Sequence, residues 1–112
     1  MHTWSSARYT FPLPDGHRFP IAKYALLRER VLADGIVPPE RMHDPARVSR
    51  DDLLLVHTAE YVDRFTNGTL DRDEVRRMGF PWSEALVERS YRAAGGTLEA
   101  ARAALEHGLA MN

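Results

Sequence analysis

The sequence has no cysteine among its 112 residues, which excludes a disulfide framework, a thiolate zinc site and a cysteine nucleophile. It also has no long hydrophobic run and no signal-like apolar segment after Met1, so we expect a cytoplasmic protein without a membrane span. Neither sign of charge dominates, because 15 Lys and Arg stand against 16 Asp and Glu. That balance gives no electrostatic reason to expect a nucleic acid or a membrane as partner.

What is present fits an ordinary globular domain. Hydrophobic residues make up 44% of the chain and charged residues 28%, and the length suffices for one domain with a modest core. The last four residues, Leu109 to Asn112, are mostly apolar and lack the polar tail common at termini. We therefore expect the chain to lead into a further element.

The strongest pattern lies between Ser83 and His107. Apolar residues recur there in alternating steps of four and three, which predicts one face of a helix. They are Val87, Tyr91, Ala94, Leu98, Ala101 and Leu105. Ser83 can cap the first turn, and Gly108 can close the last. The pair Gly95-Gly96 leaves open either two shorter helices or one helix with a bare patch for another backbone. The unbroken apolar phase favours one helix, central to an α/β core.

The N-terminal third predicts a strand, a loop and a helix. Residues 1–5 are expected to be loose, whereas the alternating pattern at 7–11 predicts a short strand. Two prolines and an Asp-Gly shape the loop at 12–18. A helix then begins near Pro20 and ends at Gly35.

A second short strand is expected near residues 41–43 or 47–48. The strand–helix–strand order favours a parallel pair in an α/β sheet. Three further helices follow, and each is predicted from its capping residue. Those residues are Ser49, Thr58 and Asp71. The first of these helices carries the apolar run Leu53–Val56, which we expect to be buried. The third ends at Gly79, before an apolar elbow that leads into the long helix.

Five histidines raise the question of a metal site, but no His-Glu-x-x-His pattern is present. Asp15-Gly16-His17 has the Asp-x-His form of some zinc sites. No third ligand lies at a plausible spacing, and the Asp-Gly pair is explained by a turn. A Ser-His-Asp arrangement, a nucleophile elbow and a phosphate-binding glycine loop are also missing. The residues by themselves therefore show no active site.

Three segments together resemble the histone deacetylase superfamily, in particular its bacterial and class IV-like members. The segment from Leu13 to Tyr24, with its Phe-Pro-x-x-Lys-Tyr form, resembles the start of that family. The segment 52–62 resembles its Leu-x-x-Val-His-Thr-x-x-Tyr pattern, and 94–101 resembles its Ala-Gly-Gly-Thr-x-x-Ala-Ala helix. The three segments keep the family's order and span nearly the whole chain.

The resemblance implies an α/β fold, the N-terminal part of a three-layer arginase/deacetylase fold with a parallel sheet, helix-rich in this part. It implies a zinc-dependent amidohydrolase acting on acetylated lysine, a polyamine or a similar amide. In such enzymes an Asp-x-His pair and a second Asp hold zinc, a histidine pair moves protons, and a tyrosine stabilises the oxyanion.

The family's Gly-Gly-x-His-His segment follows its long helix and does not occur in residues 1–112, and the zinc ligands of the family lie further on. We therefore interpret residues 1–112 as the N-terminal fragment of a single deacetylase domain. It is expected to contain no catalytic residue and no metal ligand, and to bind no cofactor by itself.

The resemblance carries over only the rim of the substrate channel. Asp15 and His17 in the proline-rich loop, with Phe80 and Trp82 in the elbow, resemble residues of the loops that border the channel. Lys23 lies near the place where some relatives have a basic residue beside an internal channel. Structural roles stay open for the same residues: Phe80 and Trp82 as core side chains, and Lys23 as a solvated helix residue.

A different class of function also stays open, a non-catalytic helical binding or assembly module that has lost the chemistry. The apolar faces of the long helix and of Leu53–Val56 exceed what two short strands can cover. The expected partners are an acetylated amide substrate in the complete enzyme, the missing C-terminal half, or a second copy. A homo-oligomer would bury Leu98, Leu105 and Leu109 against its partner.

Overall fold

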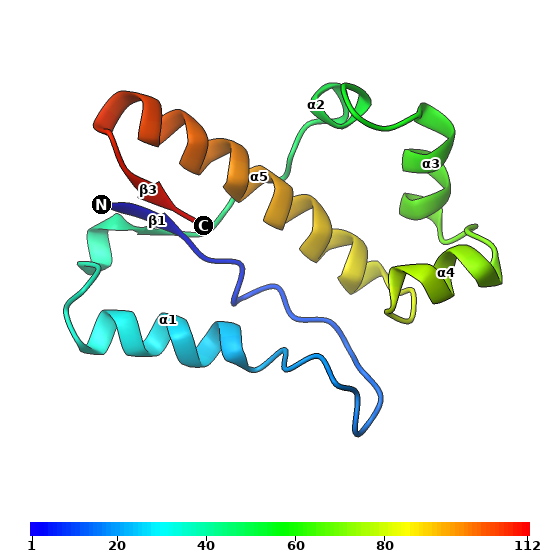
Figure 1. Ribbon diagram of the computed structural model, residues 1–112, viewed down its shortest axis with the longest axis horizontal. Helices are drawn as coiled ribbons and strands as arrows, with labels where there is room; N and C mark the ends of the chain where they lie inside the picture. Colours follow the sequence, from blue (N-terminus) through cyan, green and yellow to red (C-terminus); the bar gives the residue numbers. More distant parts are fainter.

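The computed structural model describes residues 1–112, and it combines five α-helices and a 3-10 helix with a small sheet. The elements are β1 (His2–Trp4), α1 (Lys23–Ala33), η1 (Pro39–Arg41), β2 (Met42–His43), α2 (Arg50–Leu54), α3 (Ala59–Asn67), α4 (Arg72–Met78), α5 (Glu84–His107) and β3 (Ala110–Met111). Figure 1 shows α5 as the central rod, with the strands and α1 on one side and α2 to α4 on the other.

The three strands form one parallel sheet in the order β2-β1-β3. Thr3 of β1 is the centre of this sheet, because it pairs with Met42 of β2 and Met111 of β3. In Figure 1 the strands lie between α1 and the C-terminal half of α5, which gives helices on two sides of a parallel sheet. The expected α/β class with a parallel sheet, helix-rich in this part, is confirmed.

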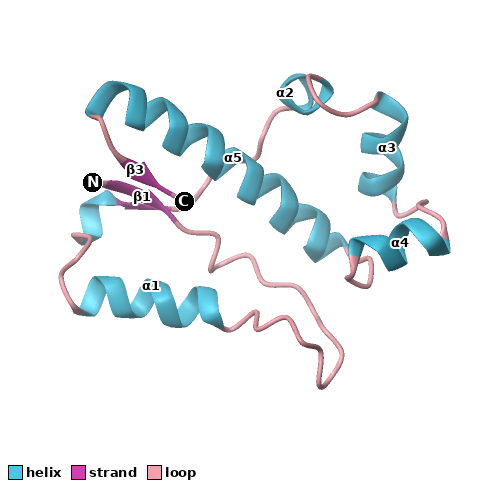
Figure 2. Cartoon of the chain, viewed as in Figure 1, coloured by secondary structure: helices cyan, strands magenta, loops and turns pink.

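The first strand lies elsewhere than the sequence predicts. Residues 7–11 form a turn and an irregular segment, so the predicted strand there is wrong, and β1 falls within the residues expected to be loose. β1 is stabilised by neighbours distant in sequence on both edges, a contribution that no local pattern reveals. The strand predicted near 41–43 is confirmed as β2. Figure 2 shows the long irregular segment that joins β1 to α1.

The long helix is continuous, and the glycine pair explains how it packs. A Cβ atom added to Gly95 would lie 2.9 Å from the carbonyl carbon of Ala46 and from the nitrogen of Val48, and closer still to the Ala46 oxygen. The Val48 N–H donates to the Tyr91 carbonyl at 3.0 Å, so the backbone after β2 is bonded directly to α5. The interpretation of one helix with a bare patch for another backbone is confirmed. Each glycine costs about 1 kcal/mol of helix propensity relative to alanine.

The predicted helix caps are present. The side chains of Ser49, Thr58 and Ser83 each accept a backbone N–H of the first turn that follows them. Asp71 forms a capping box, because it accepts the Glu74 N–H at 2.8 Å while the Glu74 carboxylate accepts the Asp71 N–H at 2.9 Å. These helices therefore begin where their local sequence signals predict.

The core is small and gathers along α5. The buried apolar side chains are Phe11, Val37, Val48, Val62, Leu86, Val87 and Ala100. The expected burial of Leu53–Val56 is wrong for this chain, because Leu55 is 82% exposed and Val56 77%. The short helix α2 ends at Leu54, and no other element covers the next two side chains. Leu105, on the predicted apolar stripe of α5, is 90% exposed.

Candidate functional site: an aromatic cluster and the adjoining cavity

Aromatic side chains from three segments meet beside α1 and form what we call the aromatic cluster: Phe11, His17, Phe19, Tyr24 and Phe80. Phe80 lies at its centre. Its ring meets the rings of Phe11 and Phe19 edge to face, with centroids 5.2 and 5.0 Å apart, and lies nearly parallel to the His17 imidazole at 5.8 Å. Edge-to-face pairs at this separation are favourable arrangements of aromatic quadrupoles. The loop and the elbow singled out from the sequence are thus in contact.

His17 fastens the loop to the elbow. The His17 N–H donates to the Pro14 carbonyl at 3.0 Å, and Gly16 at φ 74° supplies the left-handed residue of that turn. The Phe19 N–H donates to His17 Nδ1 at 3.1 Å, so Nδ1 accepts and the neutral ring carries its proton on Nε2. Nε2 then donates to the Gly79 carbonyl at 3.2 Å. Both ring nitrogens of His17 are therefore hydrogen-bonded to backbone groups.

Lys23 lies at the exposed edge of the aromatic cluster. Its Nζ is 4.9 Å from the centroid of Phe19 and 5.1 Å from that of Tyr24, within the range of cation–π attraction. The first turn of α1 therefore adds a positive charge to the apolar surface of the cluster. Its assignment to an internal channel stays a prediction.

Arg89 is a second cation that contacts the aromatic cluster, and the sequence analysis did not single it out. It is only 7% exposed and donates through Nη1 to the carbonyls of Ser6 and Tyr9, at 2.9 and 3.1 Å. Its guanidinium carbon lies 4.1 Å from the centre of the Tyr24 ring, and no carboxylate forms an ion pair with it. Burial lowers the pKa of Arg89. This buried cation pins the segment after β1 to α5.

A signal for Arg89 exists in the sequence. A second row of residues on α5 recurs in steps of three and four, and most of its members are small. The row is Leu86, Arg89, Ala93, Gly96 and Ala100. All of its members except Ala93 are buried, so this row, more than the larger apolar stripe, faces the body of the protein. An arginine in such a row predicts a guanidinium that bonds backbone carbonyls.

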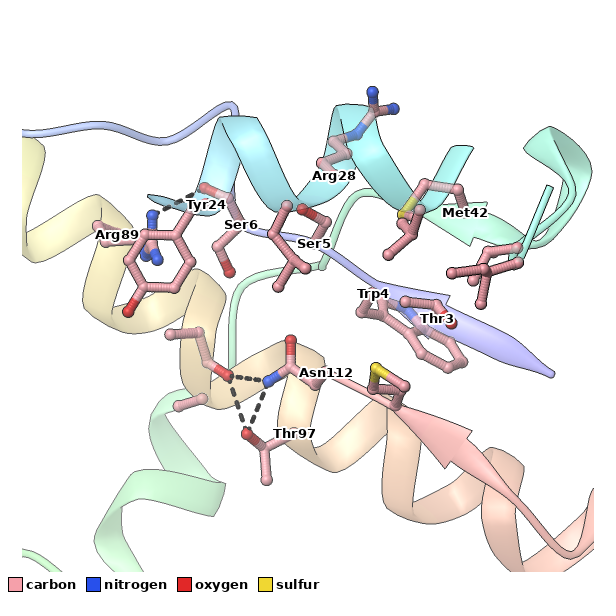
Figure 3. A pocket seen from close by; sticks show the side chains of 17 residues that line it. Thr3, Trp4, Ser5, Ser6, Tyr24, Arg28, Met42, Arg89, Thr97 and Asn112 are labelled. Carbon is pink, nitrogen blue, oxygen red and sulfur yellow. Dashed lines mark hydrogen bonds between the residues drawn. The ribbon is translucent and has the colours of Figure 1, made fainter. Parts of the chain in front are cut away.

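A cavity of about 530 Å³ adjoins the aromatic cluster, with Tyr24 and Arg89 in its wall (Figure 3). It lies between α1, α5 and the sheet, and its lining includes Ser5 and Ser6, which follow β1, and Asn112, which follows β3. In α/β proteins, ligands bind in the crevice outside the carboxyl ends of parallel strands. The cavity reaches this edge at Ser5, Ser6 and Asn112, but it also extends over the sheet itself, because residues of all three strands line it.

Polar groups line the cavity at several points. Asn112 Nδ2 donates to Thr97 Oγ1 at 2.9 Å and to the Ala93 carbonyl at 3.1 Å, as Figure 3 shows. The hydroxyl of Thr3, also in the wall, is buried without a hydrogen-bond partner. The wall is otherwise mostly apolar, which is the composition of a small-molecule site.

The remaining residues proposed for the rim lie apart from the aromatic cluster. Asp15 is exposed in the turn that His17 closes. Trp82 faces the end of α3: its Nε1 donates to the Phe65 carbonyl at 2.7 Å, and its ring fills the space where Gly68 would carry a Cβ. The structure thus brings His17, Phe80 and Lys23 together but separates Asp15 and Trp82 from them. Their place at a channel rim stays a prediction.

Zinc does not fit the groups of these 112 residues. No three His, Asp or Glu side chains converge so that they could hold a metal ion. The Asp-x-His form at Asp15 and His17 cannot serve as it stands, because both nitrogens of His17 are engaged with the backbone.

Comparison with known proteins indicates the same family that the three sequence segments resemble. Residues 17–112 match the family described as histone deacetylase domain, a family that is zinc-dependent. The chain is 45% identical, over 104 residues, to an uncharacterized protein of Picosynechococcus sp. strain PCC 7002. That alignment covers 93% of this chain but 35% of the relative. No helix combines the length and apolar character needed to cross a membrane.

Proposed function

Because the chain belongs to the histone deacetylase family, we propose that it forms the N-terminal part of a zinc-dependent deacylase domain. The small parallel sheet with helices on two sides is consistent with part of the arginase/deacetylase fold. The proposed reaction is hydrolysis of an acetyl or acyl amide of lysine, a polyamine or a similar amine, in the cytoplasm. The chain spans 35% of the relative it matches, so the zinc ligands and proton-transferring groups would come from residues outside 1–112.

The observation that carries the proposal is the contact of His17 with Phe80, in an aromatic cluster that reaches the cavity through Tyr24. Two loops 62 residues apart in sequence are tied by the bond from His17 to the Gly79 carbonyl. That bond fixes Phe80 against Phe19, which in turn contacts Tyr24 in the wall of the cavity. A wall of this kind suits the methylene chain of an acyl-lysine or a polyamine, which gains from apolar contact along its length.

In this proposal the residues present bind and orient, and they do no chemistry. Phe80 is held by Phe11 and Phe19, so its face is fixed before a substrate arrives. Fixed groups contribute more to a reaction than mobile ones, because ordering them costs nothing during binding. Lys23 would disfavour a second cation near this edge and so bear on the choice between lysine and polyamine amides.

The test uses the full-length protein that contains these residues, with an acetyl-lysine peptide and an acetylated polyamine as substrates. Phe80→Leu keeps an apolar side chain but removes the aromatic face, and we expect kcat/KM to fall about 3- to 10-fold. The control is Phe65→Leu, the same exchange on α3 outside the aromatic cluster, which should leave kcat/KM within about twofold. Equal effects of the two variants on kcat/KM, at unchanged thermal stability, would refute the proposal that the aromatic face of Phe80 binds the substrate.

The isolated chain gives a second test. We expect it to show no deacylase activity and no tight zinc binding, because its residues do not converge on a metal. Stoichiometric zinc bound at sub-micromolar affinity, and lost in an Asp15→Ala/His17→Ala variant, would overturn this expectation.

A second candidate function is an assembly module, and the exposed apolar side chains favour it. Leu105 and Leu109 are 90% and 64% exposed at the end of α5, and Leu55 and Val56 are exposed after α2. Large apolar side chains exposed to this degree favour a protein interface where they gather in one patch. If a second copy covers Leu105 and Leu109, the chain should sediment as a dimer at micromolar concentration. The Leu105→Glu variant should then sediment as a monomer. A sharp monomer in both cases would exclude this candidate.

A further inference from the structure

Three of the five histidines meet at the corner where β1, β2 and the end of α5 come together. His2 Nδ1 lies 2.8 Å from His43 Nε2, and the two ring planes differ by 15° with centroids 5.1 Å apart. A short N···N distance with nearly parallel planes at that separation places the rings edge to edge, sharing one proton in an N–H···N bond. The centroid of His107, the last residue of α5, is 5.2 Å from that of His2.

The charges around His2 are nearly all positive. Partial burial lowers the pKa of His2 first, and the neighbouring His43, His107, Arg41 and N-terminal amine lower it further. Two carboxylates lie near the corner, and one is occupied: Asp44 pairs with Arg8 at 2.9 Å. The other, Glu106, is 3.7 Å from His107 Nε2 and exposed.

The sheet that the pair joins is short. β1 has three residues and β2 has two, and beyond them the Ser5 N–H donates to the His43 carbonyl at 2.9 Å. A side-chain hydrogen bond across so few backbone bonds is a large share of what holds β2 to β1. Trp4 packs on the same side, its ring centroid 4.9 Å from that of His43.

We propose that the hydrogen bond between His2 and His43 acts as a proton-sensitive latch, which holds β2 paired to β1 near neutral pH and releases that pairing under mild acid. One added proton leaves an imidazolium that still donates to its neutral neighbour. A second proton removes the only acceptor, so the N–H···N bond breaks and two like charges face each other. Protonation of His107 adds a third charge about one ring away. This property is independent of the deacylase proposal, since it uses no residue of the aromatic cluster.

The direction of the pH effect follows from linkage. A histidine whose pKa is lowered in the folded state binds fewer protons than in the unfolded chain. The stability it contributes is present above its ordinary value of 6.5 and is lost as the pH falls through its lowered folded pKa. Between 6.5 and the lowered folded pKa, one such group changes the opening equilibrium by up to about tenfold per pH unit.

The test follows the histidine ring signals of the 112-residue chain by NMR between about pH 8 and pH 5, the interval around an ordinary histidine pKa. We expect the midpoint of His2 below 6.5. His43→Gln should raise it, because a positive neighbour is lost, whereas His57→Gln on the far side should not. Hydrogen exchange of the Ser5 amide supplies a second readout. Its protection, corrected for the intrinsic rate, should fall about tenfold from near pH 7.5 to near pH 5.5.

Two further results separate the latch from a mere structural contact. If His43→Gln disturbs the fold, His107→Gln is used instead, because it keeps the His2–His43 bond and should still raise the midpoint of His2. A His2 midpoint at its ordinary value in all variants would overturn the proposal. Ser5 protection that is independent of pH would overturn it equally, since the edge would then not depend on the pair.

Discussion

Replacing Gly95 by alanine tests how α5 is joined to the sheet. On helix propensity alone the change should stabilise the helix by about 1 kcal/mol. The added Cβ, however, would meet the backbone of Ala46 and Val48 at 2.9 Å or less, and backbone cannot rotate aside as a side chain does. Separation of the two segments would also weaken the hydrogen bond from Val48 to the Tyr91 carbonyl.

The sizes of these opposing effects decide whether Gly95→Ala stabilises or destabilises the protein. Overpacking costs about 1–3 kcal/mol, and a lost hydrogen bond adds about 0.5–1.5 kcal/mol. Together they exceed the gain in propensity, so Gly95→Ala should lower the free energy of unfolding by about 0.5–3.5 kcal/mol. The assay is urea unfolding followed by helical circular dichroism, with the m-value checked for a two-state transition.

Gly96→Ala is the matched control, since the two glycines are neighbours on the same helix. Its Cβ would meet Asn112 Oδ1 at 2.6 Å and Pro45 Cβ at 3.0 Å. The Asn112 amide is the end of a flexible side chain and can turn away, so this variant should be less destabilised than Gly95→Ala. A Gly95→Ala protein as stable as the original, or a larger loss for Gly96→Ala, would refute the close-approach argument.

Three further outcomes are expected. Hydrogen bonds from Arg64, at 2.5 and 2.6 Å, hold the pKa of Glu74 at about 2. The stability that Glu74 contributes is therefore fully present above its ordinary pKa of 4.5 and is lost as the pH falls toward 2. Glu74→Gln should flatten that part of an acid-unfolding curve. Trp82→Ala should cost about 3–5 kcal/mol in urea unfolding, whereas Trp82→Phe should lose only the bond to the Phe65 carbonyl, about 1 kcal/mol. Arg89→Met should destabilise by about 1–3 kcal/mol because two buried carbonyls lose their donor, and an unchanged unfolding midpoint would refute its role.

The sequence by itself determined the helices and their ends. Ser83, Thr58 and Asp71 each cap a helix through a residue three positions along, and Gly79 ends one by adopting a positive φ. Such signals act within one or two turns, so they operate whatever the rest of the chain does. The family was also within reach, because its three segments stand in order along the chain. His17 and Phe80 could be singled out from that resemblance.

Only the tertiary structure decided the strands, the burial and the composition of the site. β1 is a strand because β2 and β3 flank it, and those partners lie about 40 and 108 residues away. The run at 7–11 has a strand's pattern but no neighbour with which to pair. Likewise, Phe80 joins the aromatic cluster whereas Trp82, two residues later, turns to α3. Caps are satisfied locally, but strand pairing and burial require surfaces that only the folded chain brings together.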